Sequence, residues 1–323
     1  MLFEFAISSD NEKRHIFAKV PFPSSQRSAA KRTPPRFFPK PIRETKAKCE
    51  FDTLSAIFSQ FHSGPSASLS AIKMFDLLED RGIIIMEKAN GTCLNDWLRF
   101  EHRFSLRRSP LDIEAALRNT GAWLRKFHSM PDFEHTKKRH TTVSDIRASA
   151  DCLFEYFRRC SGGKQEKLVA RIESGIDSQL NGELPLGLSH SDFTPPNILI
   201  DARGCVTVID TLASWRAPVY DDLARLSVGL EFSFPQTASH GLWYPPSFVR
   251  QLEQSFWESY FGSDEVNKSA IRVFQCILGL ERWVAYHFRH SAANGWKRVV
   301  KNARARWFGR HIEKKLREWS AEF

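Results

Sequence analysis

The chain has 323 residues, of which 42% are hydrophobic and 26% charged, a composition typical of a globular protein with one large or two ordinary domains. Its apolar runs are short, so we expect neither a membrane-spanning helix nor a signal peptide. A net charge of +10 and a pI near 9.4 indicate acidic partners, which could be nucleotide phosphates, anionic glycan, a membrane surface or nucleic acid. The six cysteines lack metal-binding spacing, which predicts reduced thiols in a cytoplasmic protein.

The N-terminal part predicts a small sheet with one helix. Residues 2–7 and 15–20 alternate between apolar and polar side chains, which predicts a hairpin around a turn at 8–13. Residues 47–61 predict a helix with an apolar stripe that also carries Glu50. Two further strands are expected at 72–78 and 82–86.

Residues 21–48 form a proline-rich basic insertion. From Arg27 to Lys48 there are eight Lys or Arg residues against one Glu, and we expect no core there. We favour a disordered insertion with a solvated run of charge. The alternative is a basic flap that attracts an anionic acceptor.

The rest of the chain predicts mainly helices, over 111–128, 145–180 (broken at 161–163), 246–261, 269–288 and 296–319. We interpret His128, at the end of the first of these, as a structural histidine rather than an acid or base.

The last helix, 296–319, is basic and has two apolar stripes. Its stripes, Trp296, Val300, Ala303 and Trp307 on one side and Ile312, Leu316 and Trp319 on another, are out of phase, so we expect a bend or break near Gly309. The helix could make a peripheral contact with an anionic membrane. We favour the alternative, in which its tryptophan stripe packs on the rest of the chain.

The chain is organised around residues 188–224. Asp192 and Asn197 lie five apart in a proline-broken loop, and Asp210 ends a β-branched strand whose hairpin partner is 198–200. Phosphoryl transfer needs a carboxylate to take a hydroxyl proton and an oxygen-rich pair to hold Mg²⁺ against phosphates. The pattern therefore indicates phosphoryl transfer. The alternative is a hairpin with turn aspartates, which is our interpretation of Asp201.

Three motifs in this stretch occur in order: His190-Ser191-Asp192 with Asn197, then Ile209-Asp210, then Asp222-Leu223-Ala224. Together they resemble the catalytic core of the aminoglycoside phosphotransferase and choline kinase group, in the protein-kinase-like superfamily. The resemblance implies an α+β, two-lobed protein-kinase-like fold. A small β-rich, nucleotide-binding N-lobe would span 1–89, and a larger, mainly helical C-lobe with the acceptor site would span 90–323.

The resemblance also implies roles in the catalytic stretch. Asp192 would be the general base or would orient the acceptor hydroxyl, while Asn197 and Asp210 would hold Mg²⁺. His190 would support the loop. Asp222 would cap the next helix and hold the catalytic loop from behind.

Further roles follow for the N-lobe. Lys19 would hold the α and β phosphates of ATP, and Glu50 would pair with it. Their alternatives are a solvent-facing strand lysine and a first-turn glutamate that favours the helix dipole. Glu87 and Ala89 would lie in the hinge between the lobes, where backbone groups bind the adenine edge.

The sequence departs from the group in three places. Ser191 stands where the group usually has glycine, Ala217-Pro218 replaces a frequent Gly-Pro, and no glycine-rich loop precedes the first strand. By the resemblance, we expect the first predicted strand to correspond to the second strand of such an N-lobe. The alternatives are that the loop is supplied differently, that the start is truncated, or that ATP is bound poorly.

The function implied is an ATP- and Mg²⁺-dependent phosphotransferase acting on a hydroxyl of a small molecule or saccharide, with no DNA partner expected. The basic segments favour an anionic or lipid-linked saccharide over a polycationic aminoglycoside. The alternative is a catalytically weak, pseudokinase-like module that binds anionic membrane or polymer. The missing glycine-rich loop favours that alternative, and the presence of Lys19, Asp192, Asn197 and Asp210 opposes it.

Overall fold

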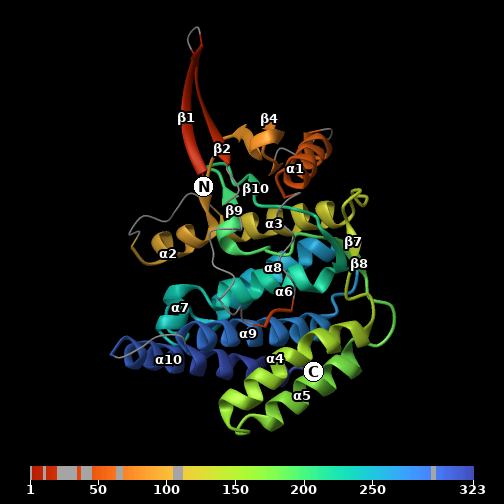
Figure 1. The fold of residues 1–323 in the computed structure, drawn as a ribbon, viewed down its shortest axis with the longest axis vertical. Helices are drawn as coiled ribbons and strands as arrows, with labels where there is room; N and C mark the ends of the chain where they lie inside the picture. The colour runs from red at the N-terminus through yellow and green to blue at the C-terminus, as the bar shows by residue number, and fades with distance from the viewer. Residues whose placement is uncertain are drawn as a thin grey trace.

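The computed structural model describes residues 2–9, 12–19, 35–37, 46–62, 68–104, 112–291 and 296–323. A small sheet-containing region lies at one end and a larger helical region fills the rest (Figure 1), which confirms the predicted fold class. In chain order the elements are β1 (Leu2–Ser9), β2 (Glu12–Lys19), α1 (Lys46–His62), β3 (Leu69–Ser70), β4 (Met74–Leu78), η2 (Glu79–Arg81), β5 (Ile83–Glu87), β6 (Thr92–Cys93), α2 (Leu94–Phe104), α3 (Ile113–His128), β7 (Lys137–Lys138), α4 (Val143–Ser161), α5 (Glu166–Gln179), β8 (Leu186–Ser189), η3 (Pro195–Asn197), β9 (Ile198–Ile200), β10 (Val206–Val208), β11 (Trp215–Pro218), α6 (Val219–Glu231), α7 (Phe234–Ala238), α8 (Pro246–Phe261), α9 (Lys268–Ser291) and α10 (Trp296–Ser320).

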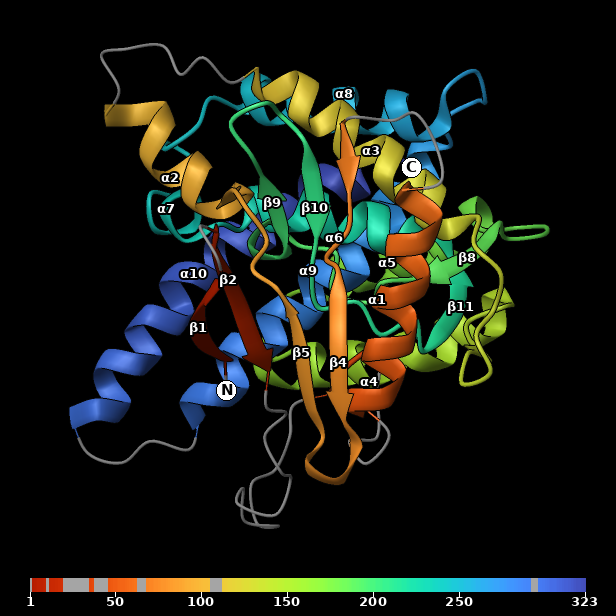
Figure 2. The same ribbon diagram turned by 90° about the horizontal axis from the view of Figure 1, so that it is seen from above.

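The first sheet has the strand order β1-β2-β5-β4, with α1 beside β4 (Figure 2). The predicted hairpin is confirmed, with Leu2 paired to Lys19. Its strands run on to Ser9 and Glu12, so the turn is shorter than expected. On α1, Glu50 and the apolar side chains of its stripe are buried, because this face packs against the sheet and the C-terminal region.

The hairpin of β9 and β10 carries the chain from Asn197 to Asp210. Its two strands pair antiparallel, from Val206 opposite Ile200 to Val208 opposite Ile198. Asp201 Oδ1 accepts hydrogen bonds from the backbone N–H groups of Arg203 and Cys205, at 2.8 and 2.9 Å. These bonds close the turn, which confirms the structural interpretation of Asp201.

Several helices begin and end at side-chain or glycine caps. Asp112 accepts a hydrogen bond from Ala115 N at the start of α3, and Thr142 with Asp145 forms a capping box at the start of α4. Gly162, at φ 61°, ends α4 in the left-handed conformation. The predicted break at 161–163 is thus confirmed.

The C-terminal helix differs from the prediction. α10 is continuous from Trp296 to Ser320, so the expected break near Gly309 is wrong. A Cβ on Gly309 would lie 2.8 Å from the His287 ring on α9, so the glycine allows close helix packing instead. The stripe Ile312, Leu316 and Trp319 is buried, as expected.

The other stripe of α10 faces outward. Val300 and Trp307 are about half exposed and Ala303 is exposed. Trp307 nevertheless packs on the chain at and beyond the end of α7, because its ring lies 4.0 Å from that of His240 and its Nε1 donates to the Ala238 carbonyl at 3.1 Å. The packing that we favoured is thus confirmed at Trp307 only in part; the Trp296 side chain lies outside the described residues. None of the described helices combines the length and the apolar character that a bilayer-spanning segment needs. All six cysteines are free thiols.

The described part of the insertion 21–48 also corrects an expectation. Phe37 is fully buried, with its ring stacked on His140 at 4.2 Å between centroids and edge-on to Phe274. Arg139 Nη2 donates a hydrogen bond to the Phe37 carbonyl at 3.1 Å. The expectation of no core in the insertion is therefore wrong at Phe37, because this residue joins the helical core; residues 20–34 and 38–45 lie outside the described ranges.

Candidate active site

Three charged side chains from separate elements meet at the edge of the first sheet. The Lys19 ammonium, at the end of β2, is hydrogen-bonded to Glu50 Oε1 on α1 and to Asp210 Oδ1 after β10. Glu50 is 1% exposed and Asp210 is 52% exposed, so Asp210 is the accessible carboxylate of the two. Burial alone would lower the pKa of Lys19, but the two carboxylates more than offset it and raise that pKa. The structure thus brings together the predicted lysine, its glutamate partner and the strand-end aspartate.

The catalytic loop places Asp192 and Asn197 beside this group. Asn197 Nδ2 donates to the backbone carbonyl of Asp192 at 2.9 Å and to its Oδ2 at 3.2 Å. The Asn197 carbonyl accepts from the backbone N–H of Ile209 at 3.0 Å. Because Ile209 directly precedes Asp210, this bond ties the loop to the predicted metal carboxylate.

His190 secures the same connection from the other side. Its Nε2 donates to the Ile209 carbonyl at 3.0 Å, and its Nδ1 accepts from the Asp192 N–H at 3.3 Å. A neutral ring protonated at Nε2 satisfies both partners, since a carbonyl can only accept and an N–H can only donate. The ring therefore fixes the loop and the strand end relative to each other, the supporting position that was expected of it.

Asp222 holds the loop from behind. Its buried carboxylate accepts from His190 N at 2.7 Å, from Ser191 N at 3.0 Å and from His128 Nε2 at 3.2 Å. Burial would raise the pKa of Asp222, but the hydrogen bond and charge of His128 outweigh burial and lower that pKa. The expectation of a helix cap is wrong, because α6 begins at Val219 and Asp222 lies within its first turn.

His128 is a structural histidine, as predicted. It is 5% exposed and lies between Asp222 and Tyr260, whose hydroxyl is 2.8 Å from His128 Nδ1. Tyr260 was missed from the sequence, because it lies on α8, far along the chain, and only the packing of α3 on α8 brings it close.

Two site residues have left-handed backbone angles. Ser191 has φ 63° and Asp210 has φ 62°. The usual glycine at the first position is free to adopt this angle, whereas a serine is strained there by about 1–2 kcal/mol. The Ser191 N–H bonds to Asp222 and to Ser189 Oγ (3.1 Å) offset this strain.

The predicted hinge follows β5. Glu87 ends the strand with its N–H donating to the Lys73 carbonyl at 2.9 Å, and Ala89 packs on the cluster of Ile84 and Met86. A Cβ on Gly91 would lie 2.6 Å from the Ile200 carbonyl, so the hinge runs directly against β9. Adenine binding by Glu87 and Ala89 stays a prediction.

A cavity of about 300 Å³ opens beside Asp192 on the side of the helical region. Most of its walls could not be predicted from local sequence patterns. They come from the loop after β8, from α6 and α9, and from the described part of the insertion: Pro35, Arg36, Asp192, Thr194, Arg225, Val228, Gly229, Leu278, Glu281, Arg282 and Ala285. The spacing of Asp221 and Arg225 was the one available clue, because an i,i+4 pair predicts the ion pair seen on α6, at 2.7 Å. Burial raises the pKa of Asp221, and the charge of Arg225 opposes this rise.

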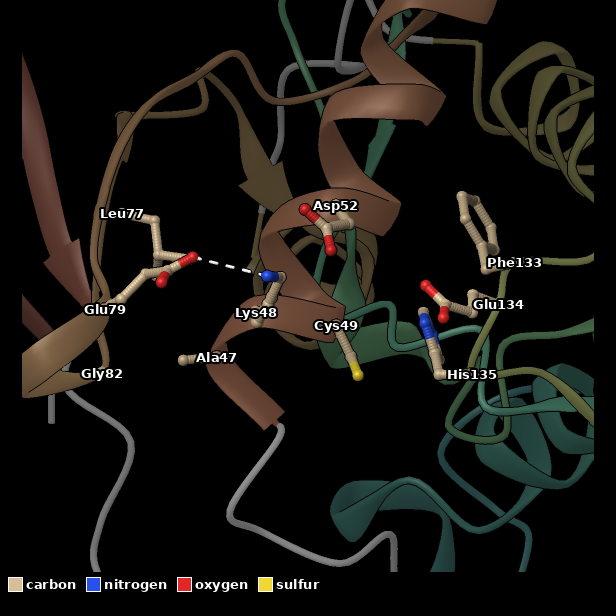
Figure 3. A pocket seen from close by; sticks show the side chains of 10 residues that line it. All are labelled: Ala47, Lys48, Cys49, Asp52, Leu77, Glu79, Gly82, Phe133, Glu134 and His135. Carbon is tan, nitrogen blue, oxygen red and sulfur yellow. Dashed lines mark ion pairs between the residues drawn. The ribbon is translucent and has the colours of Figure 1, made fainter.

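A second cavity, of about 700 Å³, lies at the N-terminal end of α1 (Figure 3). Lys48, Cys49 and Asp52 line it from α1, and Lys48 pairs with Glu79 across it at 3.6 Å. By the helical period Lys48 and Asp52 lie on the side of α1 opposite Glu50, and neither Lys19, Glu50 nor Asp210 lines the cavity. This cavity is therefore separate from the site around Lys19.

The site suits Mg²⁺ better than a metal with nitrogen or sulfur ligands. In the described part of the chain no three His, Cys, Asp or Glu side chains cluster as a metal centre. Magnesium binds through one or two carboxylates and keeps several waters. Asp210 offers an accessible carboxylate, and Asn197 directs its amide nitrogen to Asp192, which leaves its amide oxygen for a metal. The oxygens of these two residues would suit a magnesium ion.

Comparison with known proteins identifies the family. The model of the phosphotransferase enzyme family matches residues 77–243, which is just over half of the chain and includes Asp192, Asn197 and Asp210. No curated protein sequence matches significantly.

Solved structures show the fold. A choline/ethanolamine kinase family protein from Mesorhizobium loti has 12% identity and a TM-score of 0.52, over 95% of this chain and 89% of that one. Glucosamine kinase with glucosamine, ADP and inorganic phosphate has 14% identity and a TM-score of 0.56, over 96% and 74%. AMP-bound spectinomycin phosphotransferase has 15% identity and a TM-score of 0.51, over 98% and 90%. The chain therefore belongs to the phosphotransferase enzyme family and has a kinase-like fold.

Proposed function

We propose that the protein transfers the γ-phosphoryl group of ATP, with Mg²⁺, to a hydroxyl of a small molecule or saccharide in the cytoplasm. Residues 1–89 would form the nucleotide-binding lobe and residues 90–323 the acceptor lobe. The observation that carries the proposal is the convergence of Lys19, Glu50 and Asp210 beside the loop of Asp192 and Asn197.

In the proposed reaction Lys19 binds the α and β phosphates and is held in place by Glu50. Asp210 and Asn197 would hold Mg²⁺, which would neutralise charge on the phosphates when bound. The acceptor oxygen forms a bond to the γ-phosphorus, the bond from that phosphorus to the β–γ bridging oxygen breaks, and ADP leaves. The hydroxyl proton passes to the Asp192 carboxylate.

The similar structures support a nucleotide and a small acceptor. Their descriptions name ADP and AMP as bound nucleotides and glucosamine as a bound sugar. The pseudokinase-like alternative is not favoured. Lys19 is hydrogen-bonded to Glu50 and Asp210, and Asp192 is hydrogen-bonded to Asn197, so the groups expected of a phosphotransferase are present together.

Thermal unfolding with and without Mg·ATP tests the proposal. At ten times Kd the nucleotide should add about 1.4 kcal/mol to the free energy of unfolding. Asp210→Asn should lose this shift, whereas Asp201→Asn, which alters the turn of the same hairpin, should keep it. A wild-type protein that shows no Mg-dependent shift would contradict the proposal.

We also propose a peripheral membrane contact within 296–319. Val299 and Trp307 on α10 are 56% and 49% exposed, and Leu242 after α7 is 81% exposed. Residues 296–310 carry six Lys or Arg and no acidic residue. An apolar surface with basic neighbours suits an anionic bilayer interface better than nucleic acid or a second copy of equal charge.

Co-sedimentation with vesicles tests the membrane contact. The protein should bind vesicles containing anionic phospholipid and not vesicles of neutral phospholipid alone. Val299→Asp should weaken binding, whereas Leu78→Asp, at an exposed apolar position on β4, should not. Equal weakening by both variants would point to nonspecific adsorption.

A further inference from the structure

The cavity beside Asp192 has more cationic than anionic groups in its wall. It is lined by three arginines, Arg36, Arg225 and Arg282, and by the two carboxylates Asp192 and Glu281. Because the cavity borders the proposed general base, a molecule bound there would present its hydroxyl to Asp192. The charges of the wall therefore bear directly on the acceptor.

Arg225 is already neutralised within the protein. Its Nε and Nη2 donate to the two oxygens of the buried Asp221, at 2.7 and 3.3 Å. Glu281 also interacts electrostatically with Arg225. Arg225 is therefore paired inside the protein, and the other cationic groups of the wall are Arg36 and Arg282.

Arg36 and Arg282 lack such neutralisation. Neither forms an ion pair or hydrogen bond with any residue that the structure describes, and Arg282 Nε is shut off from water. Arg282 is on α9, on the same face as Leu278, Glu281 and Ala285. Guanidinium groups bind planar oxyanions such as carboxylate and phosphate with paired hydrogen bonds.

The packing of the insertion fixes Arg36 at this cavity. The next residue, Phe37, is buried against His140 and Phe274, and its carbonyl accepts from Arg139. The backbone of Arg36 is thus anchored to the acceptor side of the helical region. At residues 35–37 the structure therefore fits the basic flap, which was the alternative interpretation of the insertion.

We propose that the acceptor carries an anionic carboxylate or phosphate group in addition to the hydroxyl that is phosphorylated. Arg282 and Arg36 bind the anion. Glu281 Oε2, which is buried and has no partner among the described residues, accepts a hydrogen bond from a second acceptor hydroxyl. The cavity volume of about 300 Å³ suits a monosaccharide-sized molecule. The inference rests on the proposed function and adds its substrate class.

Four matched sugars test the charge preference: glucose, glucosamine, glucuronate and glucose 6-phosphate. Binding is measured by calorimetry in the presence of saturating Mg·ADP, and turnover is measured as ADP release from Mg·ATP. We expect glucuronate or glucose 6-phosphate to bind about tenfold or more tightly than glucose, and glucosamine to bind no better than glucose. Comparing glucuronate with glucose 6-phosphate distinguishes recognition of a carboxylate from recognition of a phosphate.

Arg282→Gln and Arg36→Gln should remove the preference for the anion, with KM for the anion raised about tenfold or more and kcat little changed. Arg250→Gln, which removes the same charge from the surface of α8, should leave the preference intact. Tighter binding of glucosamine, no binding of either anion, or an unchanged preference in Arg282→Gln would overturn the proposal. Failure of the proposed function would appear separately, as the absence of a Mg·ATP shift in thermal unfolding.

Discussion

Replacing Asp222 by asparagine should both destabilise the protein and disturb the catalytic loop. Asp222 Oδ2 accepts from His190 N and His128 Nε2, and Oδ1 accepts from Ser191 N. An amide has only one oxygen, so the best orientation keeps the first two bonds and turns an NH₂ group toward the Ser191 N–H. The lost bond to a charged acceptor costs about 1.5–3 kcal/mol, and the buried NH₂ without a partner adds about 1 kcal/mol or more.

The expected loss is therefore about 3 kcal/mol in the free energy of unfolding, measured by urea titration at pH 7.5. Asp201→Asn is the matched control. Both backbone bonds of Asp201 go to the single oxygen Oδ1, so its asparagine can keep them and should cost less than about 1 kcal/mol. If Asp222→Asn were no less stable than Asp201→Asn, the three-bond account of Asp222 would be refuted.

Three further predictions concern the same region. Gly229→Ala should reduce the rate of phosphotransfer and lower the free energy of unfolding by about 1–3 kcal/mol, because the new Cβ would lie 2.4 Å from Pro195 Cδ and displace the loop that carries Asn197. An unchanged rate of phosphotransfer in this variant would contradict the account. Ser191→Gly should leave the free energy of unfolding within about 0.5 kcal/mol, because the strain relieved at φ 63° is offset by the greater chain entropy of glycine in the unfolded state. Ser191→Val should lower the free energy of unfolding by about 2 kcal/mol, because a β-branched residue resists this angle, and equal urea midpoints for the two variants would contradict the account. Burial lowers the pKa of His140 to about 3, so between pH 3 and 6.5 the unfolded chain binds a proton that the folded chain does not, and stability falls as the pH falls. The loss in the free energy of unfolding caused by His140→Gln should therefore shrink by about 2 kcal/mol from pH 7.5 to pH 5. A loss that does not change with pH would refute the pKa shift.

The sequence by itself determined the local elements and the order of the catalytic motifs. Short-range patterns suffice for these features, because a strand or helix is set by alternation and periodicity, and the turn at Asp201 is closed by its own side chain. The resemblance of residues 188–224 to known phosphotransferases then indicated that Lys19, Glu50 and Asp210 meet, and the structure places them together.

Only the tertiary structure decided the contacts between distant segments. The sequence treats residues 21–48 as a coreless insertion, yet Phe37 finds its pocket between His140 and Phe274, which no local pattern encodes. The helix break expected near Gly309 is instead a close approach of α10 to α9. The charge that the cavity beside Asp192 offers to a ligand likewise depends on which arginines have partners. The guanidinium of Arg225 is paired inside the protein, whereas Arg282 Nε has no hydrogen-bond partner among the described residues and would be available to an anion.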